Sequence, residues 1–237
     1  MVKFWVGFAL LIAAFATVSY WSPSGLGSPG DFHLSVGGGS GERGSGVAKT
    51  ESRQVGEFSS IHAEGAGTLD VEVGPGKTGR TVEVSTDDNL IDLITTEVRD
   101  GVLEVSAVGS ISPRSDLRLK VAVPALAGIH LEGANRLNLR IDTPGNFDLH
   151  IEGAGRVRAA GKVGTLTLHS EGAGDVEANE LVAGTVDVQI EGAGKARVNA
   201  TDNLNAKIEG AGLITYSGDP KNVQKAIDGF GRIRKAE

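Results

Sequence analysis

A four-residue motif recurs along this chain at a nearly constant interval, and its period limits the folds open to the sequence. The motif is Glu-Gly-Ala-Gly or a close variant, and successive copies are separated by roughly 18–20 residues. A degenerate copy, Asp-Gly-Phe-Gly, follows one more period later and begins at Asp228. A fixed period near twenty residues is typical of a solenoid, in which each repeat stacks on its neighbour. The five regular copies begin at Glu132, Glu152, Glu171, Glu191 and Glu209.

An isolated early copy of the motif begins at Glu64, well before the copy at Glu132. The separation of these two copies is about three and a half of the later periods, so it does not fit a whole number of regular coils. The stretch between the two copies is therefore either a set of irregular coils or a different element.

Each repeat has the pattern strand, glycine bend, strand. Residues 147–152 alternate apolar and polar side chains, which is the pattern of a half-buried strand. The alternation resumes after the bend, in residues 156–159. An α-helix of ordinary length does not fit beside two strands in one repeat. The sequence therefore predicts an all-β protein with coils of about 18–20 residues.

Two β architectures fit this repeat, a parallel β-helix and an antiparallel meander. In a parallel β-helix, equivalent residues of successive coils stack about 4.8 Å apart, which places Glu177 between Arg158 and Arg197. A meander would put these groups on every second strand, too far apart to pair. The β-helix also aligns an inward and mainly aliphatic column of Leu131, Ile151, Ser170, Ile190, Ile208 and Ile227. We therefore expect a right-handed parallel β-helix.

The same stacking places the first residue of every motif in one column of carboxylates. Adjacent carboxylates at this spacing repel by about 0.9 kcal/mol in bulk water. A cation coordinated by oxygens from two coils would relieve the repulsion, with Ca²⁺ as the candidate. The alternative is a solvated charged face with counterions. The candidate metal ligands are Glu132, Glu152, Glu171, Glu191 and Glu209, and two residues before them lies a second column of His130, His150, His169, Gln189 and Lys207.

The N-terminal segment is typical of a targeting signal. Lys3 precedes an apolar run over residues 4–21, and residues 14–16 offer a small-x-small cleavage site. Residues 1–21 are predicted to be a signal peptide or, if uncleaved, a signal anchor helix that makes the only membrane contact. Residues 22–50 are rich in Gly, Ser and Pro and are predicted to be a linker. This leaves residues 51–237 for the β-helix domain, exported to the periplasm or the cell surface.

Composition excludes several classes of function. A formal net charge of -7 argues against a nucleic-acid partner, because the 23 basic residues are outnumbered by 30 acidic residues and no net positive charge is available to neutralise phosphates. The chain contains no Cys, which excludes disulfides and thiolate zinc sites. Neither a nucleophile elbow nor a P-loop occurs in the required strand-to-helix context, so no catalytic residues and no organic cofactor are expected. The acidic group Asp87, Asp88, Asn89 and Asp92 is either a cation loop or a turn between strands.

Several segments carry a family resemblance. They are residues 51–61, 87–90 and 96–103, the repeated glycine bends, and the closing segments 216–220 and 229–231. With them the chain resembles the auto-transporter adhesin, head GIN domain family of bacterial envelope proteins over residues 51–237. The resemblance implies a right-handed β-helix, an export signal and no known catalytic residues. The family's bends usually carry Ser-Gly-Ser-Gly, so the column of Glu residues is a local feature of this chain.

Three classes of function fit these observations. The first is a non-enzymatic exported envelope module, adhesin-like or structural, whose partner is an envelope protein or a surface polymer. The second is a polysaccharide-binding or polysaccharide-active β-helix, which needs long turn insertions that the regular repeats from residue 132 onward do not offer. The third is an envelope accessory or sensor protein that recruits a protein partner. A homo-oligomer formed through the less regular N-terminal end stays open.

Overall fold

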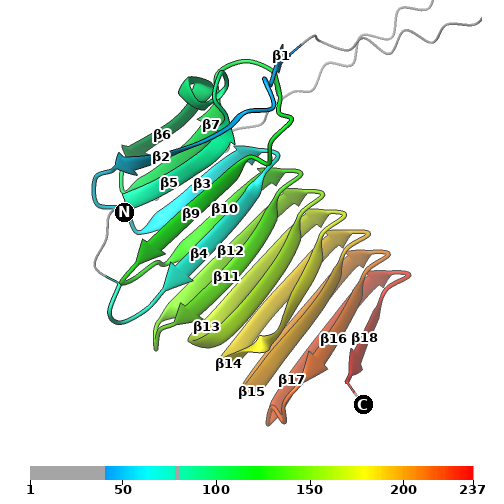
Figure 1. The fold of residues 1–237 in the computed structure, drawn as a ribbon. Coiled ribbons are helices and arrows are strands. Elements are labelled where there is room, and N and C mark those ends of the chain that lie inside the picture. Colours follow the sequence, from blue (N-terminus) through cyan, green and yellow to red (C-terminus); the bar gives the residue numbers. More distant parts are fainter. Residues whose placement is uncertain (1–40, 78–80, 237) are drawn as a thin grey trace, which may run out of the picture. The chain divides into compact units, whose positions relative to one another are not determined.

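The computed structural model describes residues 41–77 and 81–236, which form a stack of β-strand coils (Figure 1). The predicted signal or anchor segment at residues 1–21, and residues 22–40 of the predicted linker, lie outside the described residues. Within the described ranges, the single helical element is the short 3-10 turn η1 (Ile91–Leu93). None of the helical structure there is long and apolar enough to cross a membrane.

From residue 128 onward, every coil contributes one strand to each of two parallel stacks. The first stack contains β10 (Gly128–Gly133), β12 (Asn146–Gly153), the later parts of β13 (Arg156–Gly172), β14 (Asp175–Gly192) and β15 (Lys195–Gly210), and β17 (Asn222–Gly229). The second contains β11 (Arg136–Asp142), the earlier parts of β13, β14 and β15, β16 (Leu213–Ser217) and β18 (Arg232–Lys235). All of these neighbouring strands pair in parallel, which confirms the β-helix and excludes the meander.

The core is built from columns of side chains that point inward from successive coils. The predicted column has the predicted register, because Ile151 lies opposite both Leu131 and Ser170, and the pairing continues to Ile227. Ile227 was predicted to point inward, but it is 47% exposed, because it lies in the last strand of the first stack. Full burial of one aliphatic side chain contributes roughly 1.5–3 kcal/mol relative to leaving it exposed, so repetition of the column supplies stability coil by coil. Ser170 interrupts the column, and its buried hydroxyl has no hydrogen-bond partner among the described residues.

From Gly133 onward, the first glycine of each bend is required both by its backbone conformation and by the preceding coil. Gly172 has φ +103°, and a Cβ placed on it would lie 2.6 Å from the carbonyl oxygen of Gly153 in the preceding coil. The same Gly153 oxygen accepts a hydrogen bond of 2.8 Å from the N–H of Ala173. Only a residue without a side chain allows the two backbones to approach so closely. The Glu-Gly-Ala-Gly motif therefore encodes the corner of the coil.

The early motif copy belongs to the first coil of the same stack. This coil consists of β3 (Ser60–Gly65) and β4 (Thr68–Val73), and β3 pairs with β10 so that Glu64 lies directly opposite Glu132. The long segment between β4 and β10 is therefore an insertion between consecutive coils. The insertion contains β5 (Thr81–Asp87), η1, β6 (Ile94–Arg99), β7 (Val102–Ala107), β8 (Ile111–Ser112) and β9 (Arg118–Val123).

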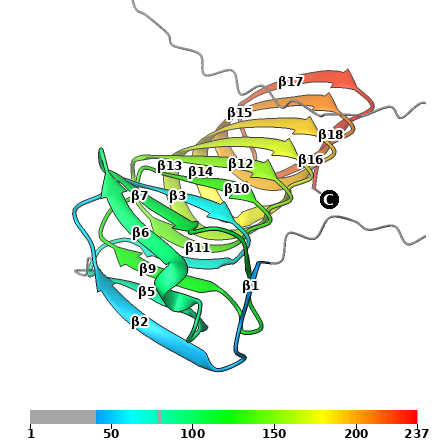
Figure 2. The same cartoon turned by 90° about the horizontal axis from the view of Figure 1, so that it is seen from above.

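The insertion combines an irregular coil with antiparallel strands. Strands β7 and β9 pair in parallel with β3 and β4, so they extend both stacks by one more level. Strands β6 and β5 then pair antiparallel with β7 and β9. Figure 2 shows this group at one end of the solenoid and β17 at the other. Both of the alternatives left open by the sequence are thus present in part.

Strand structure begins earlier than the predicted domain start at residue 51. Strand β2 (Ala48–Gln54) pairs antiparallel with β5, and β1 (Glu42–Arg43) pairs with β8. This segment lacks an apolar alternation, which is why it resembles a linker in sequence. Its anchor is the buried side chain of Asp87, which accepts hydrogen bonds from the backbone N–H groups of Gly46 at 2.7 Å and Arg114 at 2.8 Å.

Candidate functional site

The first stack of strands carries two polar columns side by side on its outer face. The parallel register aligns the histidine column, which consists of His62, His130, His150 and His169 and continues through Gln189 and Lys207. Two residues further along each strand is the glutamate column, which consists of Glu64, Glu132, Glu152, Glu171, Glu191 and Glu209. Side chains two apart in a strand share one face, and the residues between them point into the core. The structure therefore brings all five predicted glutamates into one column.

The four imidazole rings lie over one another along the solenoid axis. The distances between successive ring centroids are 4.7, 4.6 and 4.8 Å, and the two outer pairs are stacked with interplanar angles of 24° and 25°. The central pair, His130 and His150, is tilted by 47°. These separations match the spacing of neighbouring strands, so backbone pairing alone sets the geometry of the histidine column.

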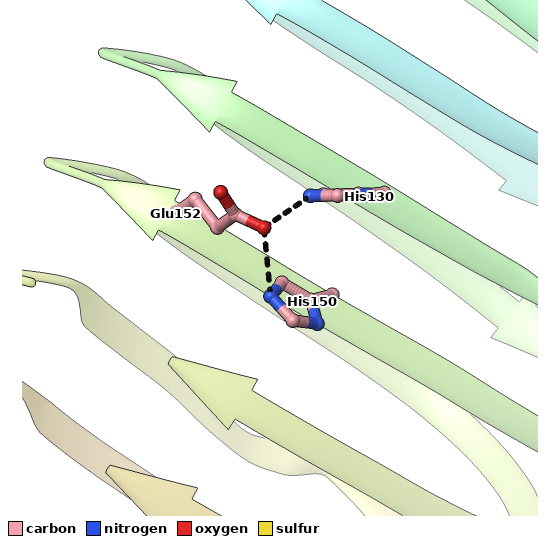
Figure 3. A group of neighbouring side chains, drawn as sticks. All are labelled: His130, His150 and Glu152. Carbon is pink, nitrogen blue, oxygen red and sulfur yellow. Dashed lines mark hydrogen bonds and ion pairs between the residues drawn. The ribbon is translucent and has the colours of Figure 1, made fainter. Parts of the chain in front are cut away.

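Nitrogen groups of the histidine column contact oxygens of the glutamate column. One oxygen of Glu152, Oε1, lies 3.1 Å from Nε2 of His130 and 3.2 Å from Nε2 of His150 (Figure 3). In the next coil, Oε1 of Glu171 lies 3.0 Å from Nε2 of His169 and 3.7 Å from Nε2 of His150. The hydrogen bonds of His130 with Glu152 and of His169 with Glu171 offset part of the repulsion expected between stacked carboxylates.

The ends of the two columns are paired as well. Beyond the last histidine, Gln189 donates to Glu191 at 2.7 Å and Lys207 forms an ion pair with Glu209. At the opposite end, Nδ1 of His62 lies 3.1 Å from Glu104, which is the residue aligned with His62 in β7. Each carboxylate named here therefore faces a nitrogen group of the neighbouring column.

Burial is the main influence on the protonation of His150, which lies between His130 and His169 in the histidine column. Desolvation lowers the pKa of His150 below its ordinary value, and the neighbouring His130 and His169 lower it further. The charges of Glu152 and Glu171 oppose this shift without cancelling it. His150 is therefore neutral at pH 7 and keeps a lone pair on one ring nitrogen. Its Nε2 atom is buried and has no hydrogen-bond partner within the described part of the chain.

Sequence reasoning missed three residues of this site, one of which, Glu64, was recognised only as an isolated early copy of the motif. His62 is the first member of the histidine column and Glu104 is its partner. His62 could have been found from the shared His-x-Glu-Gly pattern, since residues 62–65 match residues 130–133. Glu104 had no such signal, because it belongs to the insertion and follows no repeat.

The second stack of strands carries the predicted stripe of alternating charge. Glu177 lies opposite both Arg158 and Arg197, at 3.0 Å from the Nε of Arg158 and 3.5 Å from a terminal nitrogen of Arg197. The hydrogen bond from Arg158, followed by the charges of Arg158 and Arg197, lowers the pKa of Glu177. This face is hollowed over β4, β9 and β11, and its lining includes Asp70, Lys120, Arg140, Arg158, Glu177 and Arg197.

The acidic group at residues 87–92 does not join either column. Asp87 uses both carboxylate oxygens to accept hydrogen bonds from Gly46, Arg114 and Ser115. Asn89 accepts a hydrogen bond of 2.8 Å from the N–H of Ser45. These hydrogen bonds hold the segment between β1 and β2 in place, so the acidic group is a turn that anchors the N-terminal strands.

Fold and site together define a parallel β-solenoid with two repetitive polar faces. The chain belongs to the family described as "Putative auto-transporter adhesin, head GIN domain", whose profile matches residues 57–220. This confirms the resemblance carried by the sequence motifs. A comparison with curated proteins found no match.

Several solved bacterial structures are similar to this chain. One is described as a "putative adhesin" from Bacteroides fragilis NCTC 9343 and is 25% identical to this chain. The match covers 83% of this chain and 100% of the Bacteroides chain, with a TM-score of 0.60. A "putative lipid binding protein" from Parabacteroides distasonis ATCC 8503 is 21% identical, with coverage of 82% and 99% and a TM-score of 0.48. A "putative adhesin" from Parabacteroides merdae ATCC 43184 is 20% identical, with coverage of 82% and 98% and a TM-score of 0.45.

Proposed function

We propose that this protein is an exported, non-enzymatic module of the bacterial cell envelope that adheres to an envelope protein or a surface polymer through the outer faces of its solenoid. Membership of the adhesin family and the similarity to the Bacteroides structure support an adhesin-like role. The apolar segment at residues 4–21 supports export.

The observation that carries the proposal is the uninterrupted register of the polar columns. The glutamate column runs in register from Glu64 to Glu209, and the charge stripe runs from Arg158 to Arg197. Equivalent groups repeat at the strand spacing of about 4.8 Å. A repetitive ligand, such as a polymer or another regular surface, can match such a row at many points, and many weak contacts add to strong overall binding.

Location is tested by expressing the full chain in its native type of host and separating the envelope fractions. We expect the protein in the periplasmic or outer-surface fraction, and protease added to intact cells separates these two locations. Recovery of the whole protein from the cytoplasm would overturn the export part of the proposal. Mass spectrometry of the mature N-terminus separates a cleaved signal from a retained anchor.

Adhesion is tested by retention of purified protein on isolated envelope material, with one variant for each face. The first variant is Glu171→Gln with Glu209→Gln, and the second is Arg158→Ser with Arg197→Ser. We expect one of the two variants to be retained at least about tenfold less than the unchanged protein. The other variant should be retained as well as the unchanged protein, because the two faces point away from each other. Equal retention by both variants and the unchanged protein would contradict binding through these faces.

The hollow over the second face favours one alternative, binding of a polysaccharide. Its lining of mixed charge, with Asp70, Lys120 and Arg158 among the residues, suits a polar polymer with acidic or basic substituents. Binding to a panel of purified glycans, lost in the Arg158→Ser and Arg197→Ser variant, would favour this alternative. Release of new sugar ends would indicate an enzyme, and crosslinking to a single envelope protein would indicate an accessory or sensor role.

A further inference from the structure

The strongest unexplained feature of the molecule is the convergence of two histidine nitrogens on a single carboxylate oxygen. Nε2 of His130 and Nε2 of His150 lie 3.1 and 3.2 Å from Oε1 of Glu152 (Figure 3). The contact of His130 is a hydrogen bond, but the contact of His150 is not, and Nε2 of His150 is buried without a partner among the described residues. One proton on His130 satisfies one contact only, whereas a cation at this point would satisfy both nitrogens and the oxygen.

We propose that His130, His150 and Glu152 bind one divalent transition-metal ion of the zinc class. A tetrahedral zinc ion with bonds of about 2.0–2.1 Å holds its ligand atoms about 3.3 Å apart. The observed nitrogen-to-oxygen separations are 3.1 and 3.2 Å, so two of the three ligand pairs already have about this spacing. The ligand atoms of the three residues all lie within 4.8 Å of one another. Water or a partner's side chain would take the fourth position.

The donor atoms select the class of metal. Two imidazole nitrogens and one carboxylate oxygen form a set that suits zinc, and also copper, nickel and cobalt. Calcium prefers six to eight oxygen ligands and has little affinity for imidazole. The glutamate column supplies oxygens, but nitrogens of the histidine column lie beside the carboxylates of Glu152 and Glu171. The site therefore favours zinc over the calcium expected from the carboxylates alone.

A second group, His150, His169 and Glu171, sets the expected number of ions. Its contacts are less even, because Oε1 of Glu171 lies 3.0 Å from Nε2 of His169 but 3.7 Å from Nε2 of His150. Both groups use the same nitrogen of His150, and one nitrogen lone pair binds one ion. The two groups therefore exclude each other, and we expect one ion per chain at the group that contains Glu152.

The test is calorimetric titration of zinc into the purified protein after treatment with a chelator, without a histidine tag. We expect one zinc ion per chain, and an intense visible spectrum of the tetrahedral type when cobalt replaces zinc. Calcium is titrated in parallel and should bind at least about 100-fold more weakly. The readout is metal binding alone, so its failure leaves the adhesive function untouched.

Variants locate the ion within the histidine column. His150→Ala and Glu152→Gln should each weaken zinc binding by about 100-fold or more, because each removes a ligand. The matched control is His62→Ala, which removes a member of the same column that belongs to neither group, and it should change the affinity less than about threefold. Circular dichroism checks that each variant is folded, and Glu152→Gln keeps the side-chain volume if His150→Ala fails to fold.

Three results would overturn the proposal. The first is the absence of zinc binding at concentrations up to about 100 μM. The second is zinc binding that is unaffected by His150→Ala and Glu152→Gln. The third is tighter binding of calcium than of zinc, which would instead support the oxygen-only site along the glutamate column.

Discussion

Replacement of a single bend glycine by alanine tests whether close stacking of the corners holds the solenoid together. In Gly172→Ala the new methyl group would lie 2.6 Å from the carbonyl oxygen of Gly153, and φ +103° disfavours any residue with a side chain. Backbone strain contributes about 1–2 kcal/mol, and the forced contact contributes about 1–3 kcal/mol. We expect the free energy of unfolding to fall by about 2–5 kcal/mol.

The chain contains a matched control at the first corner. Gly65 has a similar φ of +107°, but a Cβ placed on it meets nothing within 4 Å. Gly65→Ala should therefore lose only the strain part, about 1–2 kcal/mol. The lower entropy of the unfolded chain with alanine affects both variants equally and cancels in the difference.

The assay is urea denaturation of the purified protein followed by circular dichroism, with the slope of the transition compared between variants. The difference between Gly172→Ala and Gly65→Ala isolates the contact between neighbouring coils, and we expect about 1–3 kcal/mol. Equal losses in the two variants would refute the reasoning, since they would show that the glycines are needed for their backbone angles alone.

Three further predictions concern single side chains. Ser170→Ala should raise the free energy of unfolding by about 1 kcal/mol, because a buried hydroxyl without a partner is removed; a loss in urea denaturation would contradict this. Burial acts to raise the pKa of Asp87, but hydrogen bonds from Ser115, Arg114 and Gly46 outweigh it and hold the pKa below the ordinary 3.8. The ionised carboxylate therefore stabilises the fold above pH 3.8, and this contribution is lost as the pH falls through the lower, folded-state pKa. Asp87→Asn should destabilise the protein at pH 7, with a difference from the unchanged protein that shrinks in thermal melts towards acidic pH. Glu177→Gln should lower the melting temperature slightly at low ionic strength, and an equal shift in about 1 M salt would argue against an ion-pair origin.

The repetitive part of the fold could be predicted from sequence because the spacing of the motif copies sets the register between neighbouring coils. Once Glu132 and Glu152 are placed in one column, every other residue of the two coils is fixed, and the same spacing gives the charge contacts of Glu177. The insertion between β4 and β10 could not be predicted in this way. Its antiparallel strands pair with segments far apart in sequence, such as β5 with β2, and no sequence repeat indicates these pairs.

The candidate site was predictable as a column of residues but not as a ligand group. Spacing placed the glutamates together and placed His130, His150 and His169 beside them. The spacing of the motif does not determine whether Nε2 of His150 turns towards Glu152, or whether the nitrogens of His130 and His150 contact the same oxygen of Glu152. Side-chain torsion angles determine both. The charge of His150 could not be predicted either, since burial and the neighbouring rings lower its pKa.

The insertion between the first two coils has a consequence for the order in which the protein folds. Aligned glutamates of neighbouring coils from β10 onward are separated by about twenty residues, whereas Glu64 and Glu132 are more than three such periods apart. Closing the longer loop costs about 1 kcal/mol more in chain entropy. We expect the later coils to pair first and the N-terminal group to dock last. His130, His150 and Glu152 all lie in the part that assembles early, so an ion bound there would act on a nascent solenoid before its first coil is in place.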